Sequence, residues 1–215
     1  MKKSKSLRVP LCTQPNGVGW CVPAAARMVM AYHGDDLPLK IIAREMGVPR
    51  HGGVDSMQAA IYLLRRGYDV RIVGWVSQYP ASFSRLRGPL PADAFLAWAS
   101  RDVGRTSAYR LACRLYGYEF VKRGGIIEPR PTTLQDIRDA VERREPPIVF
   151  VNVTTLWHRK MERFTHAVVP VSVSAASITL LDPSLAEGRS RYGTDVFLHA
   201  FYRAEGESFL IRPKR

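Results

Sequence analysis

Two adjacent prolines, Pro146 and Pro147, divide the sequence into a part with helical patterns and a part with strand patterns. Before them, apolar residues recur every three to four positions, which is typical of amphipathic helices. After them, runs of β-branched and aromatic residues bounded by turn residues predict strands. We therefore expect an α+β fold with a helical lobe, an antiparallel β-sheet lobe and a cleft between the two.

The expected elements follow from these patterns and from the turn residues between them. The expected helices cover 21–33, 38–46, 56–66, 92–118 with a break at Gly104, and a segment that begins after Thr132 or Thr133. The expected strands cover 68–75, 148–153, 165–173, 177–181 and a short segment near Phe209. A long loop with three prolines is expected over 76–91.

The length of 215 residues suits one domain. We expect a single domain over 1–215, with the mainly helical lobe over 1–147 and the β-rich lobe over 148–215. Apolar residues make up 46% and charged residues 24%, which is the balance of an ordinary globular protein. No stretch of about 18 apolar residues occurs, and the basic N-terminal segment lacks the apolar run of a signal peptide. These features predict a cytoplasmic protein without a membrane span.

The three cysteines, Cys12, Cys21 and Cys113, cannot all be paired in disulfides within one chain. Their spacing also differs from that of zinc sites. We therefore expect free thiols, and we expect neither a metal nor a cofactor.

The net charge is +13, and the basic residues are spread along the chain in short pairs such as Arg65-Arg66 and Arg143-Arg144. Spread charges of this kind usually form a generally basic surface. We therefore do not expect nucleic acid as a partner, whereas an acidic peptide would suit the charge.

Cys21 is the candidate nucleophile. It follows a turn-rich loop over 14–19 and precedes Pro23 and an alanine-rich run, so it is expected at the N-terminus of a helix. A helix N-terminus and a nearby imidazolium both lower the pKa of a thiol and so favour the nucleophilic thiolate. Taken alone, however, a cysteine is more often a buried small apolar residue.

His166 is the candidate base, because it begins an expected strand 145 residues after Cys21, a separation typical of papain-like enzymes. Asp182 ends the next expected strand, and an antiparallel hairpin would bring the two residues side by side. Asp182 could then orient the imidazole and stabilise its charged form. A satisfied core histidine and a turn-forming aspartate are the alternatives, and His158 is a second candidate base.

Gln14, seven residues before Cys21, is the candidate oxyanion-hole donor. Its side-chain amide could point to the same place as the backbone N–H of Cys21. Trp20 is expected to form a wall of the substrate-binding site, although an aromatic residue there could also simply pack the start of the helix. The expected substrate-binding residues are Trp20, Gly19, Gly53 and Thr165.

The run from Gln14 to Gly34 resembles the catalytic helix region of the bacteriocin-processing double-glycine-leader peptidases and their stand-alone relatives. Later blocks resemble the same family in the same order: Gly-Gly-Val-Asp-Ser at 52–56, Pro-Pro-Ile-Val-Phe-Val-Asn at 146–152, Thr-His-Ala-Val-Val at 165–169 and Leu-Asp-Pro-Ser at 181–184. The segment from about Val76 to Gly125 resembles no block of that family. Val22 also stands where the family usually has glycine, and Gln14 is one position further from the cysteine than is usual.

The resemblance implies a papain-like cysteine peptidase fold. It implies Cys21 as nucleophile, His166 as base, Asp182 as the orienting residue and Gln14 in the oxyanion hole. By analogy with the family, the substrate is a peptide with small residues near the scissile bond.

The resulting hypothesis is a cysteine peptidase that hydrolyses a peptide bond of a peptide or protein through a thioester acyl-enzyme. Two alternatives remain open. The same residues could serve an acyltransferase, a cyclase or a deamidase. The chain could also be a catalytically inactive binding protein that uses its basic surface.

Overall fold

The computed structural model describes residues 6–49, 52–74, 82–83, 88–100, 108–157, 165–185 and 187–214, and only the backbone of 108–114. The helices are α1 (Cys21–Tyr32), α2 (Leu39–Glu45), α3 (Ser56–Arg65), α4 (Ala92–Ala99), α5 (Ala108–Lys122), α6 (Leu134–Glu142), α7 (Val153–Leu156) and α8 (Thr194–Tyr202). The strands are β1 (Tyr68–Val73), β2 (Ile126–Glu128), β3 (Ile148–Asn152), β4 (Thr165–Val173), β5 (Ser177–Leu181), β6 (Arg189–Gly193) and β7 (Ser208–Pro213).

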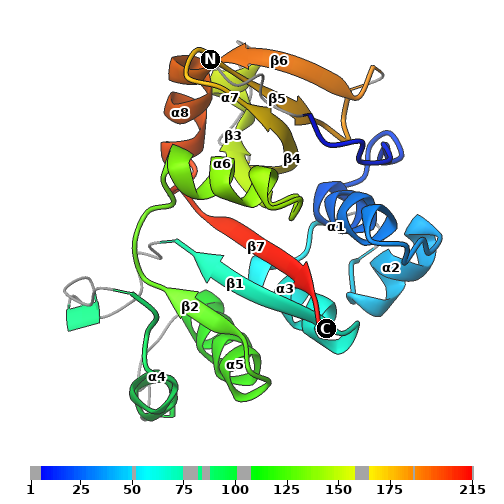
Figure 1. The fold of residues 1–215 in the computed structure, drawn as a ribbon. Helices are drawn as coiled ribbons and strands as arrows, with labels where there is room; N and C mark the ends of the chain where they lie inside the picture. Colours follow the sequence, from blue (N-terminus) through cyan, green and yellow to red (C-terminus); the bar gives the residue numbers. More distant parts are fainter. Residues whose placement is uncertain are drawn as a thin grey trace.

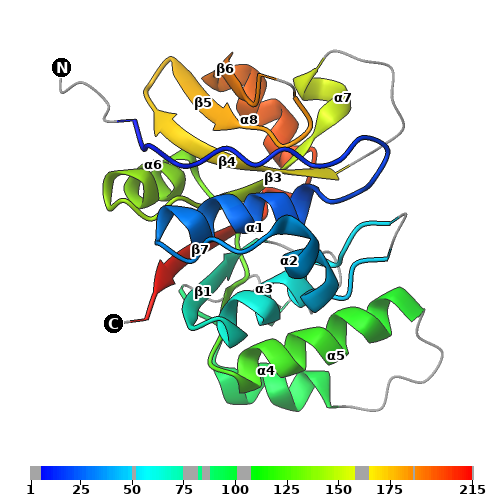
Figure 2. The same cartoon turned by 90° about the vertical axis from the view of Figure 1, so that its right-hand side faces the viewer.

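The described strands form one seven-stranded sheet in the order β2-β1-β7-β3-β4-β5-β6 (Figure 1). Neighbouring strands are antiparallel, except that β1 and β2 are parallel. Helices cover both faces of the central strands: α1 packs against β4, and α8 packs against β3 from the opposite side (Figure 2). As a result, the residues of β4 from His166 to Val171 are all buried.

A further helical layer lies on the β1 side of the molecule. α3 packs against β1, α5 packs against α3, and α4 packs against α5 (Figure 2). Gly117 allows the close approach of α4 and α5, because a Cβ at this position would lie 2.8 Å from the ring of Phe95. None of the helices in the described part of the chain is long and apolar enough to cross a membrane.

The predicted α+β fold is confirmed, but the sheet is not confined to the last third of the chain. β1 and β2 come from the first two-thirds of the sequence and extend the same sheet beyond β7. β2 and β6 were not predicted, because β2 has only three residues and β6 reads Arg-Ser-Arg-Tyr-Gly without an apolar face. Both are edge strands, where short or polar sequences are usual because they discourage pairing with other chains. The short helix α7 was also not predicted.

α1 begins at Cys21, as the sequence predicts. Trp20 occupies the N-cap position and makes no side-chain capping hydrogen bond. Nine of the twelve residues of the helix are buried, and small alanines at 24–26 let the helix pack closely against the sheet. The helix ends at His33 and Gly34, where the glycine adopts φ 92°, a left-handed conformation that suits a residue without a Cβ. The Cys21 side chain is thereby held at the first turn of a rigid helix.

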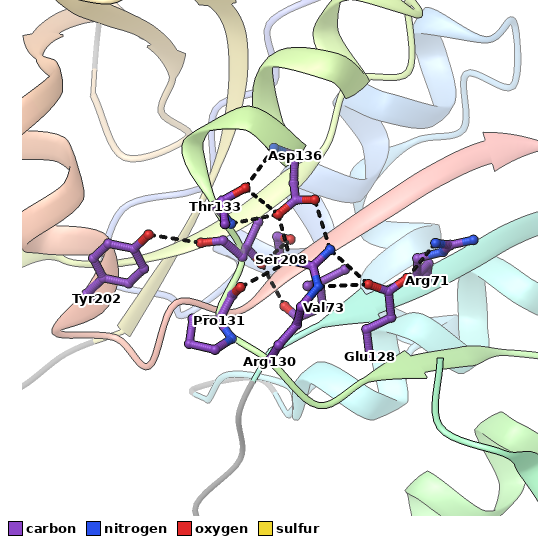
Figure 3. A network of polar contacts seen from close by, with 10 residues as sticks. Arg71, Val73, Glu128, Arg130, Pro131, Thr133, Asp136, Tyr202 and Ser208 are labelled. Atoms are coloured by element: carbon purple, nitrogen blue, oxygen red, sulfur yellow. Dashed lines mark hydrogen bonds and ion pairs between the residues drawn. The ribbon is translucent and has the colours of Figure 1, made fainter. Parts of the chain in front are cut away.

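A polar network joins the middle of the sheet to α6 (Figure 3). Thr132 donates its hydroxyl proton to the carbonyl of Val73, 2.8 Å away, and its hydroxyl lies 2.8 Å from that of Ser208. Arg130 bridges Glu128 and Asp136, and Asp136 completes the capping box of α6 with Thr133 (Figure 3). These contacts stabilise the junction of β1, β7 and α6.

Candidate active site

The β4–β5 hairpin brings His166 and Asp182 together. His166 Nε2 lies 2.7 Å from Asp182 Oδ1, and both side chains are fully buried. The two residues share a face of the hairpin because its register shifts by one residue between Pro170 and Ser172. Near the turn, Ser172 pairs with Thr179, whereas beyond the shift Val169 pairs with Leu181.

This register shift decides the geometry of the pair. A regular hairpin continued from the turn would place Asp182 opposite Val169, and therefore on the face away from His166, because side chains alternate along a strand. With the extra residue in β4, Leu181 pairs with Val169, so the next residue, Asp182, falls on the face of Val168 and His166. The prediction that His166 and Asp182 lie side by side is confirmed, but the regular hairpin on which it rested would not bring them together.

The packing of α1 against β4 brings the Cys21 thiol to the His166 ring. Burial raises the pKa of Cys21, but a hydrogen bond and charge attraction from His166, together with backbone contacts at Ala167 and Val22, outweigh this effect. The pKa of the thiol is therefore lower than usual. The start of α1 and the start of β4 lie at the same end of the molecule (Figure 2).

The contact between Cys21 and His166 also changes the pKa of His166, which it raises. Burial lowers its pKa, but hydrogen bonds and charge attraction from Asp182 and Cys21 are stronger and raise the pKa to about 9. A thiol with a lowered pKa beside an imidazole with a raised pKa favours the thiolate–imidazolium pair at neutral pH. The arrangement can therefore supply a nucleophile and a proton donor at once.

Trp157 is part of this site, although it was not among the predicted site residues. It lies directly after α7, and its Nε1–H donates to Asp182 Oδ2 over 3.2 Å. Its ring lies edge-on to the His166 ring, with 5.3 Å between the centroids. Trp157 therefore holds the carboxylate and covers the imidazole. The available signal was its place four residues after the predicted strand 148–153, but only the fold shows which group the indole meets.

The turn after β5 also holds Gln14. The backbone N–H of Gln14 donates to the carbonyl of Pro183 over 2.8 Å, and its Nε2 donates to Ser184 Oγ over 2.9 Å. In the same turn, the backbone N–H of Ser184 donates to Asp182 Oδ1 over 2.8 Å. The segment that carries Gln14 is thus attached to the turn that carries Asp182.

The structure brings two of the predicted substrate-binding residues together. A Cβ on Gly19 would lie 3.1 Å from backbone atoms of Gly52 and Gly53, so the loop before α1 and the loop before α3 touch through their backbones. Trp20 is half-buried next to Cys21. Thr165 is exposed at the start of β4, next to His166.

His158, the second candidate base, lies outside the described residues. Cys12 and Cys21 are both free and buried, and Arg27 donates a hydrogen bond to the Cys12 sulfur over 3.6 Å. Within the described ranges, no group of three or more His, Cys, Asp or Glu side chains is placed to hold a metal ion.

Three solved structures similar to this chain are described as proteases or peptidases. A double glycine motif protease from an AMS/PCAT transporter, solved in complex with the leader peptide, is 14% identical, with a TM-score of 0.53 over 100% of this chain and 97% of that chain. The peptidase domain of Streptococcus ComA, a bi-functional ABC transporter involved in a quorum sensing pathway, is 12% identical, with a TM-score of 0.54 over 96% of this chain and 100% of that chain. A C39-like peptidase from Bacillus anthracis is also 12% identical, with a TM-score of 0.54 over 100% and 99% of the two chains. At these identities the likeness shows a shared fold.

A comparison with curated protein sequences found no match. The model of the Peptidase C39-like family, by contrast, matches residues 6–208. Since this match spans nearly the whole sequence, the chain belongs to the Peptidase C39-like family.

Proposed function

We propose that this chain is a cysteine peptidase that hydrolyses a peptide bond through a thioester acyl-enzyme. The observation that carries the proposal is the buried His166–Asp182 pair, 2.7 Å apart, beside a thiol whose pKa it lowers. The pKa of Cys21 is lowered and that of His166 is raised. Two neighbouring titratable groups with such opposed pKa shifts are typical of sites that transfer protons.

In the proposed reaction, the Cys21 thiolate attacks the carbonyl carbon of the scissile bond. A C–S bond forms and the carbonyl oxygen becomes an oxyanion, which accepts hydrogen bonds from the Gln14 amide and the Cys21 backbone N–H. The C–N bond then breaks while the His166 imidazolium gives its proton to the leaving amine. Neutral His166 next takes a proton from water, whose oxygen attacks the thioester and releases the acid and the Cys21 thiolate. Asp182 orients the imidazole throughout.

We further propose a peptide with small residues next to the scissile bond as the substrate. This proposal rests on the likeness to a double glycine motif protease that was solved with its leader peptide. Gly19, Trp20, Gly53 and Thr165 are proposed to contact that peptide. They belong to the two loops and the strand start around Cys21 and His166.

Acyl transfer to an amine is a second candidate, because Cys21 is only 6% exposed and His166 only 1% exposed. A covered thioester could meet an amine held in the site before it meets water. Adding glycinamide during turnover of a fluorogenic Gly-Gly peptide distinguishes the two reactions: a transferase forms the glycinamide adduct as its main product, whereas a peptidase releases mainly the free acid.

The test of the proposed nucleophile is alkylation with iodoacetamide at pH 7, with the modified cysteine identified by mass spectrometry. Because the pKa of Cys21 is lowered, Cys21 should react about 10-fold or more faster than Cys12 and Cys113. His166→Ala should remove this advantage. His199→Ala, which changes an exposed histidine on α8, is the matched control and should leave the rate as it is.

Three outcomes would contradict the proposal. Equal labelling of the three cysteines would mean that Cys21 is not activated. A rate that persists in His166→Ala would mean that His166 is not the group that activates it. If the Cys21→Ala variant binds a peptide as well as the unchanged chain does, and the unchanged chain hydrolyses no peptide, the protein is a binding protein instead.

A further inference from the structure

The side chain of Gln14 has one hydrogen-bond partner among the residues that the structure describes. Its Nε2 donates to Ser184 Oγ over 2.9 Å, whereas its Oε1 is buried and finds no partner in the described part of the chain. Ser184 itself is exposed, so its hydroxyl lies at the border between the turn after β5 and the solvent.

In this arrangement the Gln14 nitrogen is hydrogen-bonded, but the Gln14 oxygen is not. A buried amide oxygen without a partner costs about 1–3 kcal/mol, so the Gln14 side chain would gain by turning outward and binding water through Oε1. Within the described part of the chain, the bond to Ser184 is the side-chain contact that opposes this rotation. The backbone bond from Gln14 N–H to the Pro183 carbonyl holds the main chain but leaves the side-chain torsions free.

The bond also leaves one donor available. A primary amide carries two N–H protons on the same nitrogen, and Ser184 accepts one of them. The second remains for an oxyanion. A hydrogen bond to one proton of a planar amide fixes the direction of the other, because both lie in the amide plane.

We propose that Ser184 is a positioning residue that holds the Gln14 amide in the oxyanion hole. The inference rests on the proposed function and adds a residue to it. It also links two parts of the site, because the turn 182–184 holds His166 through Asp182 and Gln14 through Ser184 and Pro183. Ser184 touches neither the substrate nor the reacting atoms in this role.

The test compares two probes of Cys21 that differ in their need for an oxyanion hole. Iodoacetamide alkylates the thiolate and forms no oxyanion. The Cys21 thiol adds to the carbonyl carbon of the peptide aldehyde acetyl-Gly-glycinal. That carbon becomes tetrahedral, and its oxygen requires the hydrogen-bond donors of the oxyanion hole. Both probes are applied to the full chain, and the thiolate–imidazolium pair is common to both reactions.

For Ser184→Ala we expect acetyl-Gly-glycinal to bind about 10-fold more weakly, equivalent to ~1.4 kcal/mol, while the alkylation rate stays within about twofold. Ser184→Thr keeps a hydroxyl and should restore the affinity. In a Gln14→Ala background, the additional Ser184→Ala change should have little further effect, because both changes remove the same donor. Ser174→Ala, at the other end of the same hairpin, is the control and should bind the aldehyde like the unchanged chain.

A readout without a ligand keeps the inference independent of activity. The side-chain amide signals of Gln14 in a ¹H–¹⁵N spectrum are identified by their loss in Gln14→Ala. In Ser184→Ala, and not in Ser174→Ala, they should move to the position of solvent-exposed glutamines.

The outcomes separate the inference from the proposed function. Unchanged aldehyde affinity and unchanged Gln14 signals in Ser184→Ala would overturn the inference alone. Equal losses in alkylation and aldehyde binding would overturn it too, because the change would then act through Cys21 or the fold. If the unchanged chain neither reacts at Cys21 nor binds the aldehyde, the proposed function fails, and the inference fails with it.

Discussion

At His166, burial and charge act on the same proton in opposite directions. The low-dielectric surroundings favour the neutral ring, but Asp182 on one side and the Cys21 thiol on the other favour the charged ring more strongly. The protonated imidazole is therefore the resting form up to about pH 9, and it is the form that can donate a proton to a leaving amine.

This balance predicts an alkaline limit to activity. The kcat/KM of peptide hydrolysis should fall as the pH rises through about 9, because the pKa of His166 is raised to about 9 and the ring loses its proton there. Asp182→Asn removes the strongest interaction that raises this pKa, so the alkaline limit should move to lower pH and kcat/KM should fall about 100-fold. The measurement is kcat/KM for one fluorogenic peptide between pH 5 and 10. An alkaline limit at the same pH in both proteins would mean that Asp182 does not act on His166.

Trp157 provides a second prediction at the residue scale. Trp157→Phe keeps an aromatic ring beside His166 but removes the N–H that binds Asp182 Oδ2. Hydrogen bonds to charged groups contribute about 1.5–3 kcal/mol, so the free energy of unfolding should fall by that amount, and kcat/KM should fall about 10-fold. Urea unfolding and peptide hydrolysis measure the two effects.

Trp98→Phe is the matched control, because Trp98 packs beside Phe95 on α4, the helix that packs against α5. It should leave kcat/KM unchanged whatever its effect on stability. If both variants lower kcat/KM equally, the loss of activity in Trp157→Phe does not come from the lost hydrogen bond between Trp157 and Asp182.

At the scale of elements, the loop before α1, which leads to Cys21, meets the loop before α3. The two loops touch at Gly19, Gly52 and Gly53 without side chains between them. α1 itself is held by its buried face against β4, and this backbone contact lies just before its N-terminus.

Gly19→Ala should therefore destabilise the chain, since the added Cβ would lie 3.1 Å from the backbone of the facing loop. Overpacking of this kind costs about 1–3 kcal/mol. Gly53→Ala is the matched comparison, because among the described residues its Cβ would meet Gly19 O at 3.8 Å, an ordinary contact. Thermal unfolding of the three proteins measures the difference, and a Gly19→Ala variant as stable as Gly53→Ala would show that the loops separate freely.

At the scale of the whole molecule, the charge of +13 is the property most open to a functional test. A basic surface attracts anionic ligands over distances comparable to the Debye length, and added salt screens this attraction. If the substrate is an acidic peptide, the charge contributes to its capture before any contact in the site is made.

We expect kcat/KM for a Gly-Gly peptide with an acidic flank to fall several-fold between about 0.05 and 0.5 M NaCl. The same peptide with glutamine in place of each acidic residue should show little change. Equal salt dependence of the two peptides would exclude a role for the net charge in substrate capture.

The sequence by itself determined the local features of this site. Pro23, the alanines after it and Gly34 specify where α1 begins and ends, so Cys21 could be placed at a helix N-terminus without a structure. Apolar runs identified β3, β4 and β5 for the same reason: their patterns depend on residues close in sequence. The general α+β class follows from the order of these segments.

Only the tertiary structure decided which residues share a face and which meet across the chain. The register shift in β4, which puts His166 and Asp182 on one face, depends on pairing between strands. The contacts of Trp157 with Asp182 and of Ser184 with Gln14 join residues 25 and 170 positions apart. The edge strands β2 and β6 likewise form because a neighbouring strand is present, since their own sequences carry too little apolar pattern to specify a strand.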